Sequence, residues 1–385
     1  MSRRRRHFVA GNFPPAARIG ALAAVFPLLL VGCASKEQKE QVGESSEART
    51  VEVTVTTEGC RPEPAKVSAG LVRFHVTNQG AAAVNEVELL AGKRILGEKE
   101  NLAPGLSGEF TLRLEPGTYT LYCPNAETQR TDFTVTGTTA ASSSAGAAEA
   151  TTTYHDYVVA EARELLEETE RFADSVRRGD VAAARELYGE ARWHYEAIEP
   201  VAESFGDLDP AIDARADDVA DPAQWTGFHR IEKALWADGS LAGMTPVADR
   251  LVADVRRLVD LITTQRYQPA QIANGAVELL DEIGRTKVTG EEERYSHTDL
   301  VDIDANLNGA KEAYEAIRPL LVRKNADLAQ TIDQRFESAL AALAPYARGE
   351  SWVAYTEVDT AGRRAIAQHV DAVAEPLSQV AALVG

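Results

Sequence analysis

A histidine and a glutamate stand three residues apart in the segment WTGFHRIEKALW, residues 225–236. Helix-forming residues dominate after Gly227, and residues three apart lie on one face of a helix. His229 and Glu232 are therefore predicted to present an imidazole and a carboxylate side by side. Such a pair can ligate a metal ion, although on its own it is more often an ordinary surface pair.

A second pair with the same spacing, Glu196 and Glu199, lies in the preceding helical segment. Two helices that each offer such a pair can face one another in a bundle, and carboxylate bundles that hold iron use a related arrangement. The intervening loop, FGDLDPAIDAR, adds Asp207, Asp209 or Asp213. Carboxylates with one imidazole form a hard, negative site that suits iron, manganese or calcium. A cation would also relieve the repulsion among these acids.

The helical part of the sequence contains a repeat. Residues 191–200, ARWHYEAIEP, and residues 310–319, AKEAYEAIRP, are identical at six of ten positions. This similarity predicts two related helical bundles. Glu199 of the first copy corresponds to Arg318 of the second, so we expect a bound cation in the first copy only.

Three further segments are expected between the N-terminal region and the end of the chain. Residues 51–137 consist of short alternating stretches separated by turn signals, which predicts a small β-sandwich. Residues 138–152 are rich in Gly, Ala, Ser and Thr and are predicted to be a linker. Residues 153–385 have helical periodicity throughout. The expected fold is therefore a β-sandwich followed by a double helical bundle.

The N-terminal residues have the pattern of an export signal. Residues 1–32 combine a basic start with an apolar stretch of signal-peptide length. The stretch ends in LVGC, residues 30–33, which resembles a lipobox and predicts lipidation of Cys33. Arg5 and Arg6 leave ordinary Sec export and twin-arginine export both open. Residues 33–50 are polar and are predicted to be a flexible tether from the lipid anchor.

The net charge of the chain is -19. This value argues against nucleic acid as a partner, because binding to phosphates needs a basic surface. It is compatible with a cationic ligand.

The β-domain contains two cysteines, Cys60 and Cys123, and export would place them in an oxidising compartment where a disulfide is possible. A thiolate pair that binds metal remains the alternative. A blue-copper centre needs two histidines and usually a methionine, whereas this domain has His75 alone and no methionine. The period of the strand places His75 on the face opposite Phe74 and Val76, which predicts an exposed side chain.

Several of these motifs resemble a known family. TGFHRIEKALW, HYEAIEP, FGDLDPAIDAR and RYSHTDLVDIDANLNGA resemble the imelysin-like helical domain of EfeO-type iron-uptake lipoproteins. In the β part, CRPEP, NEVELL, GEKENLAPG and PGTYTLYC resemble the cupredoxin-like domain that precedes it. The resemblance covers nearly all of residues 51–385.

The resemblance implies a lipid-anchored, extracytoplasmic protein that binds ferrous or ferric iron. Its partners would be an EfeU-type iron permease and an EfeB-type haem peroxidase. In the helical domain it implies the metal ligands Glu196, Glu199, Asp213, His229 and Glu232. In the β-domain, where copper or zinc are also options, it implies Cys60, Glu86, Glu88, Glu98, Glu100 and Cys123.

Two other functions remain open from the sequence. The first is a metallopeptidase that uses the region of His229, although the motif is not H-E-x-x-H and no separate catalytic base is evident. The second is a polysaccharide-binding or adhesive surface lipoprotein in which the metal only braces the bundle. An iron carrier without enzymatic activity is the leading interpretation.

Overall fold

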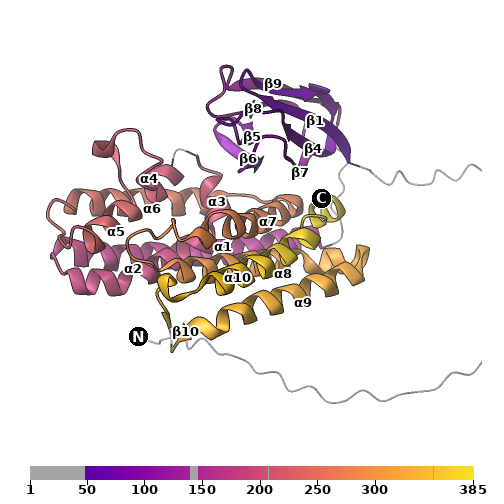
Figure 1. The fold of residues 1–385 in the computed structure, drawn as a ribbon. Coiled ribbons are helices and arrows are strands. Elements are labelled where there is room, and N and C mark those ends of the chain that lie inside the picture. Colours follow the sequence, from indigo (N-terminus) through magenta and orange to yellow (C-terminus); the bar gives the residue numbers. More distant parts are fainter. Residues whose placement is uncertain (1–47, 139–145, 207, 350) are drawn as a thin grey trace, which may run out of the picture. The chain divides into compact units, whose positions relative to one another are not determined.

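The computed structural model describes residues 48–138, 146–206, 208–349 and 351–385. Within them, the strands that form sheets come first and the helices follow (Figure 1). The predicted signal peptide, Cys33 and most of the predicted tether lie outside the described residues.

Nine strands form the β-domain, in two sheets with the orders β2-β1-β4-β7 and β3-β9-β8-β5-β6. Their bounds are β1 Arg49–Thr56, β2 Gly59–Glu63, β3 Lys66–Ser68, β4 Gly70–Asn78, β5 Val87–Ala91, β6 Arg94–Lys99, β7 Ser107–Leu114, β8 Gly117–Tyr122 and β9 Arg130–Thr136. This agrees with the sandwich expected from the alternating sequence.

The alternation of the sequence explains which faces of these strands are buried. In β4, Phe74 and Val76 are fully buried, whereas His75 between them faces outwards. The imidazole of His75 pairs with Glu52 of the neighbouring strand at 2.7 Å, on an exposed surface. The prediction of an exposed His75 is confirmed.

Cys60 and Cys123 are joined in a disulfide, with their Cα atoms 6.2 Å apart. The bond connects β2 to the residue that follows β8. Neither sulfur is then available as a thiolate, because both are consumed in the bond. The inclusion of Cys60 and Cys123 among the metal ligands is therefore wrong in this structure.

The remaining described residues are mostly helical, with one short hairpin. The helices are α1 Ala147–Arg177, α2 Val181–Glu196, α3 Glu199–Glu203, α4 Asp209–Asp213, η1 Pro222–Gln224, α5 Phe228–Trp236, α6 Thr245–Thr264, α7 Pro269–Arg285, η2 Lys287–Thr289, α8 Asp299–Lys324, α9 Ala326–Leu343, η3 Ala344–Tyr346, η4 Tyr355–Glu357, α10 Thr360–Leu377 and α11 Val380–Val384. The hairpin pairs β10 Ala347–Arg348 with β11 Ser351–Trp352.

The first helix begins earlier than the sequence suggested. Residues 147–152 were expected to belong to the linker, but α1 begins at Ala147. Alanine has the highest helix propensity, so an alanine-rich stretch joins a helix as soon as its next turns can pack. Ala150 and Tyr154 supply that packing, because both are buried.

The helical residues share a single hydrophobic core that extends from Ala150 to Val384, rather than two separate cores. The two copies of the repeat also differ in structure. In the first copy α2 ends at Glu196 and α3 begins at Glu199, whereas the second copy continues unbroken through α8 with Pro319 inside the helix. Arg318 pairs with Asp333 at 2.5 Å on a half-exposed surface.

Among the described residues, no helix combines the length and the apolar character needed to cross a membrane.

Candidate metal centre

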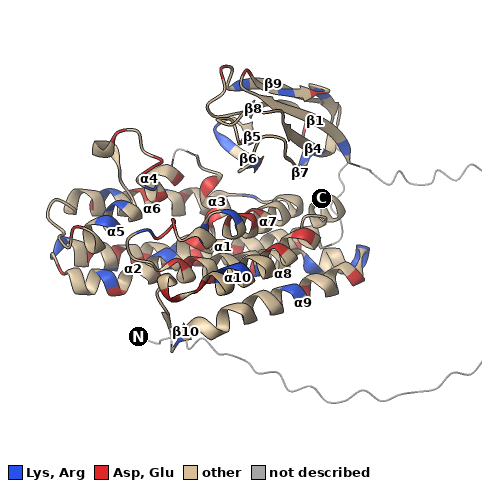
Figure 2. Ribbon diagram, in the orientation of Figure 1, with Lys and Arg blue, Asp and Glu red and all other residues tan. Residues whose placement is uncertain are grey.

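The structure brings all five predicted helical-domain ligands into one region of the core. Their oxygen and nitrogen atoms form overlapping groups in which every ligand atom lies within 4.8 Å of the others. These groups are Glu196, Glu199 and Asp213; Asp213, His229 and Glu292; and His229, Glu232 and Glu293. Figure 2 shows part of this acidic character as red segments on α3 and α4.

Gly227 allows the end of α4, which carries Asp213, to approach the start of α5. Its φ is 86°, a left-handed conformation that favours glycine. A Cβ at this position would collide with the backbone carbonyl of Ile212. The close approach places Asp213 Oδ1 3.6 Å from Nε2 of His229.

A second glycine, Gly309, allows α8 to approach the end of α2. A Cβ there would collide with the carbonyl of Ala197. One turn earlier on α8, Asn306 donates from Nδ2 to Oε2 of Glu196 at 3.0 Å and to Oε2 of Glu199 at 3.1 Å. Asn306 thereby holds these two carboxylates side by side.

His229 lies between carboxylates on both sides of its ring and is 1% exposed. Its Nδ1 lies 3.2 Å from Glu232, and its Nε2 lies 3.4 Å from Glu292 without a hydrogen bond of good geometry. Burial and the charge of Arg192 lower the pKa of His229. The contacts with Glu232 and Glu292 outweigh both effects and raise it to about 9.

Glu232 is fixed by the backbone of a distant segment. The amides of Tyr295 and Ser296 both donate to its Oε1 at 2.8 Å. These bonds leave Oε2 facing His229. Although burial raises the pKa of Glu232, the pairing with His229 and the two amides lower it below its usual value. A carboxylate that stays ionised in the core is a suitable ligand for a cation.

Two basic side chains, Arg192 and Lys287, are also fully buried within the cluster. Arg192 donates to Glu196 and Asp213, and its Nε lies 3.0 Å from Glu293. Lys287 contacts Glu196, and it contacts Glu199 at 2.9 Å. Buried charges of this kind persist because opposite charges compensate them.

The two cations do not compensate every carboxylate. Burial and the charges of Glu196 and Glu282 raise the pKa of Glu199 well above its usual value. Burial and the charge of Glu293 do the same for Asp302, whose two side-chain oxygens have no hydrogen-bond partner. The cluster therefore keeps an excess of acidic groups that an additional cation or protons must balance.

Five of the charged groups in the cluster were not predicted: Arg192, Lys287, Glu292, Glu293 and Asp302. The two glutamates belong to the run EEER, which directly precedes the motif YSHTDL. A run of acids beside a family motif was the one available signal. Nothing marked the two basic residues, since buried lysine and arginine are rare. Of the other loop acids, Asp209 accepts a hydrogen bond from Tyr195, and Asp207 lies outside the described residues.

The β-domain brings together three of its four predicted glutamates. Glu88 of β5 is the cross-strand neighbour of Glu98 of β6, and Glu86 directly precedes β5. Ligand atoms of these three residues lie within 4.8 Å of one another. Burial and the neighbouring acids raise the pKa of Glu86 to about 8, and burial and Glu86 raise that of Glu100 to about 8.

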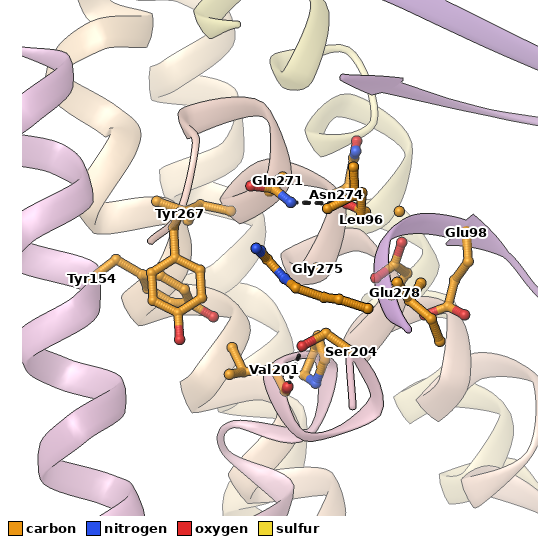
Figure 3. A pocket seen from close by; sticks show the side chains of 15 residues that line it. Leu96, Glu98, Tyr154, Val201, Ser204, Tyr267, Gln271, Asn274, Gly275 and Glu278 are labelled. Atoms are coloured by element: carbon orange, nitrogen blue, oxygen red, sulfur yellow. Dashed lines mark hydrogen bonds between the residues drawn. The ribbon is translucent and has the colours of Figure 1, made fainter. Parts of the chain in front are cut away.

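A cavity of about 50 Å³ is lined by residues of β6, α1, α3 and α7. Figure 3 shows Tyr154 and Tyr267 at one end of it and Glu98 and Glu278 at the other. The amide of Gln271 donates to the backbone carbonyl of Leu96 across the cavity at 3.1 Å.

Comparisons with known proteins identify both domains. The imelysin family model matches residues 150–380, and a model of the cupredoxin-like domain matches residues 21–135. The chain is 38% identical to the iron uptake system component EfeO of Escherichia coli O157:H7, over 87% of this chain and 91% of that protein. EfeO of Escherichia coli K12 and of Shigella flexneri match equally well over the same shares.

A solved structure has a similar fold over part of the chain. The crystal structure of an iron-regulated protein A precursor from Parabacteroides distasonis superimposes with a TM-score of 0.50 and 15% identity, covering 62% of this chain and 95% of that one. The two domain matches and the 38% identity over most of the chain show that the chain belongs to the family of EfeO-type iron-uptake components.

Proposed function

We propose that this protein is an extracytoplasmic, lipid-anchored iron carrier that binds iron in its helical domain and passes it to a membrane permease. The single observation that carries the proposal is the convergence of Glu196, Glu199, Asp213, His229 and Glu232 in the core. Hard oxygen ligands with one imidazole suit iron. The similar proteins from Escherichia coli are iron uptake system components, which supports iron as the cargo of this chain.

The ligand set would include Glu292 as well. Its carboxylate faces Nε2 of His229 on the same side as Asp213. An ion seated among these three side chains would have ligands from the end of α4, from α5 and from the segment before α8. This arrangement would couple iron binding to the packing of three separate parts of the chain.

Burial favours a carrier over a peptidase, the activity in the name of the imelysin family model. His229 and Glu232 are at most 1% exposed, and a peptide bond would have to reach them through the core. A catalytic metal keeps an open position beside a substrate cleft. Glu199, Glu203 and Glu282 form a further acidic group in which the last two are half-buried, so a single ion would meet carboxylates before it reaches the fully buried ligands.

Delivery to an EfeU-type permease, cooperation with an EfeB-type peroxidase and lipidation of Cys33 belong to the same proposal. An iron-limited strain that lacks its own component should regain growth with the wild-type gene. The H229A/E232A variant should fail to restore growth although it is exported in equal amount. Restoration by this variant would contradict the proposal, and so would hydrolysis of peptides by the wild-type protein with no iron-dependent growth.

A further inference from the structure

Lys287 places a positive charge directly on two of the carboxylates proposed to bind iron. Its ammonium group donates to Oε2 of Glu196 and, at 2.9 Å, to Oε2 of Glu199. A third carboxylate, Glu282, lies 3.6 Å away. The lysine side chain has no exposed surface.

The oxygens that Lys287 contacts are the ones that a metal ion would need. Asn306 donates to the same Oε2 atoms of Glu196 and Glu199 and so fixes them next to each other. A metal ion would bind such oxygens at about 2.0–2.6 Å. An ammonium in the same place would repel the ion strongly at short range in a buried site.

Arg192 is less suited than Lys287 to yield its place to a metal ion. It uses the other oxygen of Glu196, Oε1, and binds Asp213 as well. Its guanidinium also lies 5.6 Å from the ring centre of Phe228 and 5.7 Å from that of Tyr195. A lysine has a flexible four-carbon stem and a compact charge, whereas a guanidinium that bonds at several points is held in one geometry.

From this geometry we infer that Lys287 is an internal competitor of the cargo ion: iron binds Glu196 and Glu199 only by displacing the ammonium group of Lys287. The inference rests on the proposed iron site. The exchange would make the affinity lower than the carboxylates alone could give. When the ion leaves, the ammonium group of Lys287 would return and compensate the charges of Glu196 and Glu199. This return would lower the barrier to release of the ion.

The test is the affinity of the protein for Fe²⁺, measured without oxygen against a chromogenic chelator. K287M removes the charge but keeps most of the apolar stem, and it should bind Fe²⁺ at least about tenfold more tightly and release it more slowly. The matched control is K311M. Lys311 pairs with Glu315 in the second copy of the repeat, so this variant removes the same charge elsewhere on the chain. Its affinity should stay within about twofold of wild type.

Loss of the lysine also leaves two buried carboxylates uncompensated, so K287M and K287Q are both made and their helicity is measured in chelator. If a variant folds only when Fe²⁺ is added, the ion has replaced the lysine charge and the inference stands. If both variants are folded and bind Fe²⁺ as wild type does, or more weakly, the inference is wrong. Absence of Fe²⁺ binding by the wild-type protein would instead overturn the proposed function itself.

Discussion

Nε2 of His229 lies 3.4 Å from Oε1 of Glu292, although the two residues belong to distant segments of the chain. Glu292 is buried and is also paired with Arg215 at 2.9 Å. Burial raises the pKa of Glu292, but the contact with His229 and the charge of Lys287 hold it well below its usual value. Glu292 is therefore an ionised carboxylate beside the proposed ligand.

Replacing Glu292 by glutamine should weaken iron binding by about 10–100-fold, the usual effect of losing a group that ligates or orients a metal-bound histidine. The fold should persist, because the amide keeps the shape of the side chain. E291Q is the matched control, since Glu291 is exposed and pairs with Arg294 at the surface. Equal iron affinities of the two variants, measured by competition with a chelator, would remove Glu292 from the site.

Iron binding should release protons near neutral pH. A metal ion binds only neutral imidazole, and the pKa of His229 is raised to about 9. With the ordinary histidine pKa of about 6.5, iron binding would release a proton from His229 mainly in acidic solution. Affinity should therefore rise as pH increases from about 7 to about 9. Calorimetry in buffers of different ionisation enthalpy should detect at least one proton released at about pH 7.5.

The control for proton release is H194Q, because His194 pairs with Glu161 outside the cluster. This variant should release as many protons as wild type. An affinity that does not change between about pH 7 and pH 9 would contradict the raised pKa of His229.

Thermal stability in chelator should fall as pH rises from about 5.5 to about 8.5. Burial and neighbouring acids raise the pKa of Glu86 and Glu293 to about 8, and burial chiefly raises that of Glu88 to about 7. The folded chain then holds protons that the unfolded chain, with a glutamate pKa of 4.5, has already lost. The free energy of unfolding falls as pH rises wherever the folded state binds more protons than the unfolded state.

The corresponding variant is E98Q, because Glu98 is buried beside Glu86 and Glu88, and burial and the charge of Glu100 raise its own pKa. It should flatten the decline and raise the melting temperature at about pH 8, by roughly 2–4 °C for each kcal/mol gained. E109Q changes an exposed glutamate of β7 and should leave the curve as it is. A melting temperature that rises with pH in the wild-type chain would show that the acidic groups are ionised in the folded state.

Removing the disulfide should lower the stability of the β-domain without changing the iron affinity of the helical domain. Cys60 and Cys123 are 63 positions apart in the sequence. For a loop of this length, chain entropy predicts that loss of the bond lowers the free energy of unfolding of the β-domain by about 4 kcal/mol. C60S/C123S should retain the iron affinity of the helical site, because neither cysteine belongs to the groups of potential ligands that contain His229 or Glu196. Denaturant unfolding and iron titration of the same samples measure both effects. A parallel loss of iron affinity would contradict this prediction and show that iron binding in the helical domain depends on the disulfide.

The sequence predicted the part of the site that depends on the spacing of residues within one helix. The pairs His229/Glu232 and Glu196/Glu199 are visible because residues three apart share a helix face. Glu292 could not be placed in this way, since it reaches His229 only through the packing of the segment before α8. Lys287 is harder still, because lysine is almost never fully buried and two of the glutamates that it contacts, Glu196 and Glu199, are far from it in the sequence.

The fold class followed from periodicity, and it is confirmed in the strands and helices. The boundary of α1 was missed because alanine-rich sequence is compatible with both a linker and a helix, and buried contacts at Ala150 and Tyr154 decide between them. The choice between a disulfide and a thiolate pair depended on the approach of β2 to the end of β8. Sequence separation alone contains no information on that distance.

The most direct test of the central claim is the number of tightly bound Fe²⁺ ions per protein molecule, compared between wild type and H229A/E232A. E315Q serves as the control, because Glu315 is the counterpart of Glu196 in the second copy of the repeat. We predict that the double variant loses one equivalent of iron while its helicity is retained, and that E315Q loses none. An unchanged iron content in a folded H229A/E232A variant would show that the cluster around His229 is not the iron site.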